Sequence, residues 1–317
     1  MSTAIENTDL SLAIVFPGQG SQSPGMLSEL AASYPLVNET FAEASDVLGY
    51  DLWTLTQDGP EEELNRTDKT QPAMLAAGVA VWRVWQHAGG AVPGVLAGHS
   101  LGEYSALVCA GALEFSEAIS LVEERGRCMQ SAVPAGVGAM AAILGLDDAT
   151  VTDVCYRAAA GEVVSPVNFN SPGQVVIAGN AAAVERAIVL AKEAGAKRAL
   201  PLAVSVPSHC ALMQPAAEQF AERLAQTTIS TPAIAVMQNV DAAIHEQPDV
   251  IRENLAKQLY CPVQWVLSVQ HLSGQGVTRI VEAGPGKVLA GLCKRIDKSI
   301  DSASIFDSAS LAAALGN

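Results

Sequence analysis

Basic side chains are scarce in this sequence. Lys and Arg number 18 against 33 Asp and Glu, which gives the 317-residue chain a formal net charge of -15. Because such a chain repels phosphate groups, we expect no nucleic acid partner. An anionic partner would have to meet a local basic patch, and the best candidate is the cluster of Lys287, Lys294, Arg295 and Lys298. A solvated helix face is the alternative interpretation of this cluster.

Long apolar runs and metal-ligand motifs are lacking as well. The most apolar long segment, residues 73–84, is interrupted by Arg83 and is too short to span a membrane. The N-terminus has no Lys or Arg and only a short apolar run, unlike a secretory signal. The six Cys are widely scattered without the spacing of a metal site, which favours reduced, buried thiols. These features predict a cytoplasmic protein with no membrane partner and no metal.

Apolar residues make up half of the chain and few of them are aromatic, which suits helices packed on a buried parallel sheet. Short apolar runs predict strands of this sheet at residues 12–16, 95–97, 233–240 and 278–282. Helical patterns lie between them, at residues 25–34, 36–48, 71–88, 104–108, 116–131, 210–226, 249–259, 262–272 and 287–297. The main body is therefore expected to be α/β.

A different pattern begins at Pro134. Strands and helices now follow in the order β-α-β-β-α-β, which is typical of a ferredoxin-like unit. The predicted strands are 139–144, 163–168, 174–178 and 198–204, and the predicted helices are 147–160 and 181–194. We therefore predict an inserted subdomain at residues 134–205, with residues 1–133 and 206–317 forming the main body.

The motif with the clearest chemical meaning is the Gly-x-Ser-x-Gly turn at residues 98–102, centred on Ser100. An apolar strand leads into it and a helix of small residues follows, which is the context of a nucleophile elbow. Such a turn exposes the serine hydroxyl at the start of a helix. The pattern by itself is equally consistent with an ordinary glycine-rich turn.

A serine nucleophile needs a base, and the chain has five His. His99 should point away from Ser100 and support the turn by hydrogen bonding. His209 starts a helix after a loop that leaves a strand, where catalytic residues are common, although it could be an ordinary helix residue. For the oxyanion hole, the candidates are the backbone N–H of Leu101 and Gln19, which could instead only stabilise its own loop.

Arg125 stands on an otherwise apolar helix stripe between Leu121 and Met129. A guanidinium in such a place is costly unless it meets a carboxylate. The partner could be internal, for example Glu103 or Glu114. Alternatively, Arg125 binds a carboxylate of the substrate with two hydrogen bonds.

Taken together, several motifs resemble one family, the malonyl-CoA:acyl carrier protein transacylases of bacterial type II fatty acid synthesis. The resemblance covers residues 12–296 and shows no departure at a catalytic position. The motifs are at residues 17–22, 98–104, 125, 206–209, 258 and 284–287. It implies an α/β-hydrolase-like body with a parallel sheet and an inserted ferredoxin-like (βαββαβ) subdomain.

The resemblance also implies the roles of the site residues. Ser100 would carry the malonyl ester, and His209 would act first as general base and then as general acid. Gln258 would orient His209 through its backbone carbonyl, so that no acidic partner is needed. The backbone N–H groups of Gln19 and Leu101 would form the oxyanion hole.

In the implied reaction, malonyl-CoA acylates the serine, and the phosphopantetheine thiol of acyl carrier protein then takes the malonyl group for fatty acid chain elongation. Arg125 would bind the malonyl carboxylate, and no bound cofactor is expected. The acidic carrier protein would be a transient partner that docks on Lys287, Lys294 and Arg295.

Three alternatives stay open. The first is a serine hydrolase such as an esterase, against which Arg125 argues because a neutral ester needs no cation. The second is a non-catalytic subunit that binds a carrier protein, which the complete set of catalytic positions disfavours. The third is the same acyl transfer in polyketide synthesis, where the free-standing length favours fatty acid synthesis instead.

Overall fold

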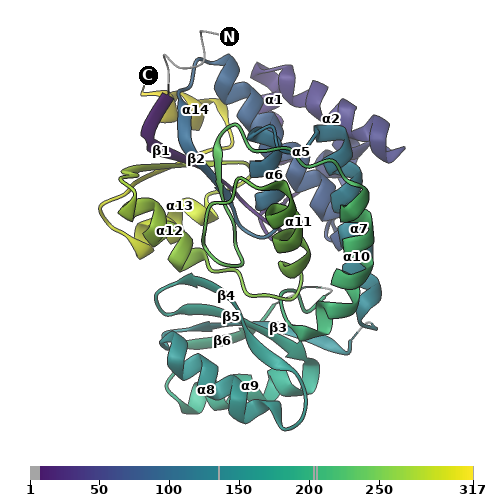
Figure 1. Ribbon diagram of the computed structural model, residues 1–317, viewed down its shortest axis with the longest axis vertical. Helices are drawn as coiled ribbons and strands as arrows, with labels where there is room; N and C mark the ends of the chain where they lie inside the picture. Colours follow the sequence, from purple (N-terminus) through teal and green to yellow (C-terminus); the bar gives the residue numbers. More distant parts are fainter. Residues whose placement is uncertain (1–7, 135, 203, 205, 317) are drawn as a thin grey trace.

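The computed structural model describes residues 8–316 apart from 135, 203 and 205, and it contains two separate β-sheets surrounded by helices (Figure 1). The predicted α/β class with a parallel sheet is confirmed. Residues 1–7 and 317 of the predicted body, and 135, 203 and 205 of the predicted subdomain, lie outside the described residues. Within the described part, no helix has the length and apolar character needed to cross a membrane.

The five-stranded sheet is parallel throughout, with the order β7-β2-β1-β8-β9. Its strands are β1 (Thr8–Phe16), β2 (Val92–Gly98), β7 (Ala235–Met237), β8 (Arg279–Ala283) and β9 (Asp301–Ile305). β1 is central, and its last residue, Phe16, pairs with Gly98 at the end of β2. The loops that follow these two strands therefore emerge side by side at one edge of the sheet.

Helices cover both faces of this sheet. Alternate residues of β1 point to opposite faces, and both sets are apolar, so each face needs its own layer of helices. Ile14 and Phe16 pack into the larger core, and Ala13 and Val15 pack into the smaller one. The larger core includes residues of α1 (Ser28–Ser33), α2 (Leu36–Leu48), α3 (Leu52–Asp58), α4 (Glu61–Leu64), α5 (Thr67–His87), α6 (Gly102–Cys109), α7 (Phe115–Ala132), α10 (Gln214–Gln226), α11 (Pro248–Lys257) and α14 (Ser308–Leu315). The smaller core is covered by α12 (Trp265–Gly274) and α13 (Val288–Ile296).

The four-stranded sheet is antiparallel, with the order β4-β5-β3-β6. Its strands are β3 (Gly138–Leu144), β4 (Val164–Ser171), β5 (Gln174–Asn180) and β6 (Arg198–Pro201). One face packs on α8 (Asp148–Ala159) and α9 (Ala181–Glu193), at the bottom of Figure 1. On the opposite face, Met140 and Val176 pack with Cys210, which follows β6 in the chain. A short 3-10 helix (Ala211–Met213) then leads into α10.

Some predicted boundaries differ from the structure. α5 begins at Thr67 rather than at residue 71, because its polar first turn lacks the apolar periodicity that marks the rest of the helix. β7 keeps only Ala235–Met237 of the predicted strand 233–240. Beyond it, the backbone N–H of Asn239 donates to the Glu103 carboxylate instead of a neighbouring strand. β6 ends at Pro201, and residue 203 of its predicted range lies outside the described residues.

Candidate active site

The Gly-x-Ser-x-Gly motif forms the predicted sharp turn between β2 and α6. Ser100 has a φ of 51°, in the left-handed region that non-glycine residues rarely adopt. A Cβ atom on Gly98 would lie 1.9 Å from the carbonyl carbon of Gly102, and one on Gly102 would lie 2.0 Å from the carbonyl oxygen of Phe16. Gly98 is therefore needed for the two ends of the turn to approach each other, and Gly102 is needed for the turn to pack against the end of β1.

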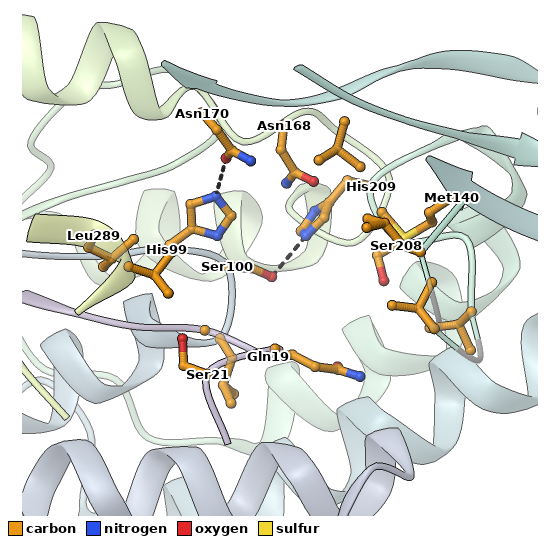
Figure 2. Close-up of a pocket in the computed structure, with 18 of the residues that line it drawn as sticks. Gln19, Ser21, His99, Ser100, Met140, Asn168, Asn170, Ser208, His209 and Leu289 are labelled. Carbon is orange, nitrogen blue, oxygen red and sulfur yellow. Dashed lines mark hydrogen bonds between the residues drawn. The ribbon is translucent and has the colours of Figure 1, made fainter. Parts of the chain in front are cut away.

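His209 reaches this turn from the loop before α10 (Figure 2). Its Nε2 lies 2.8 Å from Ser100 Oγ, and its Nδ1 lies 2.7 Å from the main-chain carbonyl oxygen of Gln258. Because a carbonyl oxygen only accepts, Nδ1 carries the ring proton and Nε2 is free to accept the serine proton. No carboxylate of the described residues hydrogen-bonds to this ring.

The His209 imidazole is kept neutral by its surroundings. Burial is the main cause that lowers the pKa of His209 from 6.5 to about 3, and the positive charge of Arg125 is the second. The hydrogen bond to the Gln258 carbonyl raises the pKa and only partly opposes these effects. At neutral pH the ring is therefore in the form that can take a proton from Ser100.

Arg125 lies in α7 with its guanidinium buried beside Ser100. Nη1 donates to Gln71 Oε1 at 2.8 Å, and Nη2 donates to Gln258 Oε1 at 2.9 Å and to Ser100 Oγ at 3.4 Å. Burial lowers the pKa of Arg125, which nevertheless remains a cation at neutral pH.

The internal salt bridge considered for Arg125 is not found among the ion pairs of the described residues. Glu114 is exposed at the start of α7, and Glu103 accepts hydrogen bonds from Asn239 and Gln258 instead. The guanidinium therefore contacts neutral oxygens, and its Nε is buried without a partner in the described part of the chain.

The two oxyanion-hole candidates come from the serine turn and from the loop after β1. Leu101 follows Ser100 and is buried, and Gln19 lies in the loop after β1. The Gln19 side chain points away from Ser100 in Figure 2, and its Nε2 donates to Thr67 Oγ1 at 3.3 Å. The side chain therefore joins the loop after β1 to the start of α5.

His99 hydrogen-bonds away from the Ser100 hydroxyl, in agreement with the prediction. Its Nε2 lies 2.8 Å from Oδ1 of Asn170 in β4 (Figure 2), and its ring packs near Trp265. Burial lowers the pKa of His99. This contact connects the serine turn to the antiparallel sheet, a partner that the sequence alone did not identify.

A cavity of about 240 Å³ lies between the serine turn and the antiparallel sheet. Met140 and Leu289 contribute apolar surface to its wall, and Asn168 and Ser208 contribute polar groups (Figure 2). Met129 also lines the cavity. The cavity therefore combines apolar walls with the reactive groups Ser100 and His209, which is typical of a small-molecule site.

Sequence reasoning missed several residues that hold the site together. Asn239 accepts from the backbone N–H of Ser100 through Oδ1 at 2.6 Å and donates to the Gly98 carbonyl oxygen through Nδ2 at 2.6 Å. Its place just after β7, at the same sheet edge as the turn, was a usable signal. Gln71, a buried amide at the start of the apolar part of α5, was another.

The basic candidates lie beside the cavity. Lys287, Lys294 and Arg295 are exposed at α13, whose Leu289 lines the cavity wall. Arg295 Nη1 also donates to Gln174 Oε1 at 2.9 Å and so joins α13 to β5. In the described part of the chain, no group of three or more His, Cys, Asp or Glu is arranged to hold a metal ion. All six Cys are free thiols.

Comparison with known proteins gives the family. Residues 13–314 match the acyl transferase domain family. A malonyl CoA-acyl carrier protein transacylase of Escherichia coli (strain K12) is 61% identical over 303 residues, which span 96% of this chain and 98% of the relative. The crystal structure of an acyl carrier protein S-malonyltransferase from Vibrio cholerae is 62% identical with a TM-score of 0.93, and the match covers 96% of this chain and 99% of that one.

A malonyl-transacylase solved in complex with its type II PKS acyl-carrier protein is also similar, with 59% identity and a TM-score of 0.95 over 96% of this chain and 99% of that one. These matches extend over nearly the whole chain and confirm the resemblance seen in the motifs. The chain therefore belongs to the malonyl CoA-acyl carrier protein transacylase family of acyl transferases.

Proposed function

We propose that this acyltransferase moves a malonyl group from malonyl-CoA to the phosphopantetheine thiol of acyl carrier protein, through an ester on Ser100. The observation that carries the proposal is the meeting of three groups at one hydroxyl. Ser100 Oγ lies 2.8 Å from His209 Nε2 and 3.4 Å from Arg125 Nη2. A nucleophile, a neutral base and a buried cation together suit an acyl group that ends in a carboxylate.

In the first transfer, Ser100 Oγ attacks the thioester carbonyl carbon of malonyl-CoA while His209 Nε2 takes the hydroxyl proton. The backbone N–H groups of Gln19 and Leu101 donate to the oxyanion of the tetrahedral intermediate. When the intermediate collapses, its carbon–sulfur bond breaks and His209 returns the proton to the CoA sulfur. The Gln258 carbonyl, as acceptor for Nδ1, keeps the ring in the tautomer that both proton transfers need.

The second transfer is the same reaction with a new thiol. His209 takes the proton of the phosphopantetheine thiol, whose sulfur attacks the ester carbonyl carbon on Ser100. The carbon–oxygen bond to the serine then breaks, and the proton goes back to Ser100 Oγ. The malonyl thioester leaves on the carrier protein, and the free serine is restored.

Arg125 is assigned to the free carboxylate of the malonyl group. Its Nε has no partner in the described structure, and its other donors contact amide and hydroxyl oxygens that carry no charge. The guanidinium therefore keeps its full charge for a substrate anion. A neutral ester would leave this buried cation without a counter-ion, which argues against the esterase alternative.

Acyl carrier protein is the proposed partner, as an acidic and transient one. Lys287, Lys294 and Arg295 are the proposed docking surface, because they are exposed beside the cavity of an otherwise acidic chain. We assign the reaction to fatty acid elongation in the cytoplasm, with no bound cofactor. Polyketide synthesis is the alternative, since the partner in the solved complex is a type II PKS acyl-carrier protein.

We further assign the body, residues 1–133 and 206–317, to an α/β-hydrolase-like fold and residues 134–205 to a ferredoxin-like subdomain. A parallel sheet whose serine turn directly follows β2 supports the first assignment. The strand order β4-β5-β3-β6, with α8 and α9 on one face, supports the second.

The test is intact-mass spectrometry of the protein after mixing with malonyl-CoA. We expect one malonyl adduct on the natural protein, none on Ser100→Ala, and movement of the adduct to added holo acyl carrier protein. Malonylation of Ser100→Ala would contradict the assignment of the nucleophile. Loss of the adduct to water faster than to the thiol would support the hydrolase, and binding of carrier protein without any adduct would support the non-catalytic subunit.

A further inference from the structure

A buried carboxyl group, that of Glu103, lies next to the serine turn; burial raises its pKa to about 7, and hydrogen bonds from Asn239 and Gln258 oppose this shift. Glu103, in the first turn of α6, has no exposed surface, and no Lys or Arg among the described residues forms an ion pair with it. Its carboxylate instead accepts three hydrogen bonds, from Gln258 Nε2 at 2.8 Å, the backbone N–H of Asn239 at 2.9 Å and Gln238 Nε2 at 3.2 Å. All three neighbours donate, which is the environment of a carboxylate that accepts only.

The side-chain amide of Gln258 lies between the Glu103 carboxylate and the Arg125 guanidinium. Its Nε2 donates to Glu103 and, at 3.1 Å, to the Ser100 carbonyl oxygen, while its Oε1 accepts from Arg125 Nη2 at 2.9 Å. A carboxylate only accepts and a guanidinium only donates, so these two partners determine which way the amide is turned. The main-chain carbonyl of the same residue holds His209.

We infer that Glu103 is a positioning residue that determines acyl-group selectivity, because its carboxylate turns the Gln258 amide so that Oε1 holds the Arg125 guanidinium in place. The inference rests on the proposed malonyl transfer. It requires the carboxylate to act on the guanidinium through the amide rather than to pair with it. If Glu103 contacted Arg125 directly, it would neutralise the charge that the malonyl carboxylate needs.

Glu103 also reaches the nucleophile, but by a separate route. It binds the backbone N–H of Asn239, whose Oδ1 accepts from the backbone N–H of Ser100. A disturbance along this route slows every acyl substrate, because each one reacts at Ser100. A disturbance of the Gln258 side chain can also reach the Ser100 carbonyl oxygen, but only its effect on Arg125 depends on a free carboxylate in the substrate. The ratio of malonyl to acetyl reactivity therefore isolates the inferred role.

Two variants of Glu103 separate the effect of side-chain length from the effect of charge. Glu103→Gln keeps an oxygen at the length needed to accept from Gln258 but has no charge. Glu103→Asp keeps the charge but is one methylene shorter, so its oxygens fall short of the amide. Acylation rates of each protein with malonyl-CoA and with acetyl-CoA are measured by rapid quench and intact mass.

If Glu103 positions the amide, Glu103→Asp should lower the ratio of malonyl to acetyl acylation rates by about tenfold or more, because one hydrogen bond to a charged group is lost. Glu103→Gln retains that hydrogen bond, so its ratio should stay within about threefold of that of the natural protein. The reverse order would mean that only the charge matters and would overturn the inference, as would an unchanged ratio in both variants. The ratio compares two substrates on the same folded molecules, so a smaller folded fraction leaves it unaltered.

Glu282→Gln is the matched control, because Glu282 is an equally buried carboxylate in β8 that hydrogen-bonds to the backbone N–H of Ala290 and not to Gln258, Asn239 or Arg125. Its ratio should equal that of the natural protein. In a double-mutant cycle, Glu103→Asp should lower the ratio no further in a Gln258→Leu background, since the amide that it acts on is gone. Additive losses would contradict the route through Gln258. Failure of the natural protein to become malonylated would instead refute the proposed function.

Discussion

Ser100 and His209 meet at 2.8 Å across 109 positions of sequence, and both hold a left-handed backbone conformation. Their φ angles are 51° and 65°, and each such residue costs about 1–3 kcal/mol of strain. Hydrogen bonds hold both backbones in place: the Ser100 N–H donates to Asn239 Oδ1, and the His209 N–H donates to the Leu259 carbonyl oxygen. The strain is therefore maintained at the two residues that would exchange a proton.

Replacing the base should slow acylation without removing the nucleophile. We expect His209→Ala to lower the rate of Ser100 acylation by about 10²–10⁴-fold, which is the usual contribution of a general base. Rapid-quench intact-mass measurements with malonyl-CoA give this rate. The control is His99→Gln, which changes the neighbouring His that bonds to Asn170. An equal loss in that control would argue against His209 as the base.

The lowered pKa of His209 predicts activity at acidic pH. With a pKa of about 3, the ring stays neutral well below 6.5. The acylation rate with acetyl-CoA should therefore change little between pH 7 and pH 5, where a base of ordinary pKa would lose about 25-fold of its neutral form. Arg125→Gln removes a charge that lowers this pKa, so its rate should begin to fall at a higher pH. If the acylation rate of the natural protein fell with a midpoint near pH 6.5, the lowered pKa of His209 would be contradicted.

Loss of the buried cation should separate malonyl from acetyl substrates. We expect Arg125→Ala to lower malonyl acylation by about 10²–10³-fold, because a buried charge partner is removed, and acetyl acylation by less than about tenfold. Arg125→Lys should not restore the rate, since an ammonium cannot donate to Gln71, Gln258 and a substrate in the same geometry. Equal losses with both substrates would show that the residue is structural.

The docking surface can be tested by charge reversal. Lys294→Glu should raise the KM for acyl carrier protein several-fold and leave the KM for malonyl-CoA nearly unchanged, and the effect should weaken at high salt. Lys192→Glu on α9 is the matched control, because this exposed lysine lies on the far side of the antiparallel sheet (Figure 1). Unchanged carrier-protein kinetics in Lys294→Glu would favour the solvated-face interpretation.

Glu282 should make the protein less stable as pH rises. Burial raises the pKa of Glu282 from 4.5 to about 7, and hydrogen bonds from the backbone at the start of α13, such as that from the Ala290 N–H to Oε2 at 2.8 Å, oppose this shift only in part. Between these two pH values the folded state binds a proton that the unfolded state lacks, so the free energy of unfolding falls as pH rises from about 5 to 7 and then levels off.

Glu282→Gln removes this contribution. Urea unfolding at pH 5.5 and pH 8 should therefore show a smaller decrease in stability at high pH in the variant than in the natural protein. The buried His209 acts in the opposite direction, because its lowered pKa makes stability rise with pH, but it is the same in both proteins and cancels in the comparison. The same pH dependence in both proteins would mean that the Glu282 carboxylate is not perturbed.

The strands and the serine turn could be predicted because their signals are local. The apolar run at 12–16 is uninterrupted since β1 is buried on both faces, and glycines flank Ser100 since the turn packs against β1. The βαββαβ order and the burial of Arg125 could likewise be predicted from periodicity. The end of β7 was not predicted, because residues 238–240 continue the apolar pattern in part while Asn239 hydrogen-bonds to the serine turn rather than to a strand.

What the sequence determined by itself was the order of the elements, the identity of the nucleophile candidate and the presence of a buried cation. Which groups surround that cation was decided only by the tertiary structure. Gln71 and Gln258 lie 54 and 133 positions from Arg125, which they bind, and Glu103 lies 155 positions from Gln258, through which it acts on Arg125. The spacing of apolar residues in the sequence indicates that a side chain is buried. Its hydrogen-bond partners depend on which ends of strands and helices the folded chain brings together.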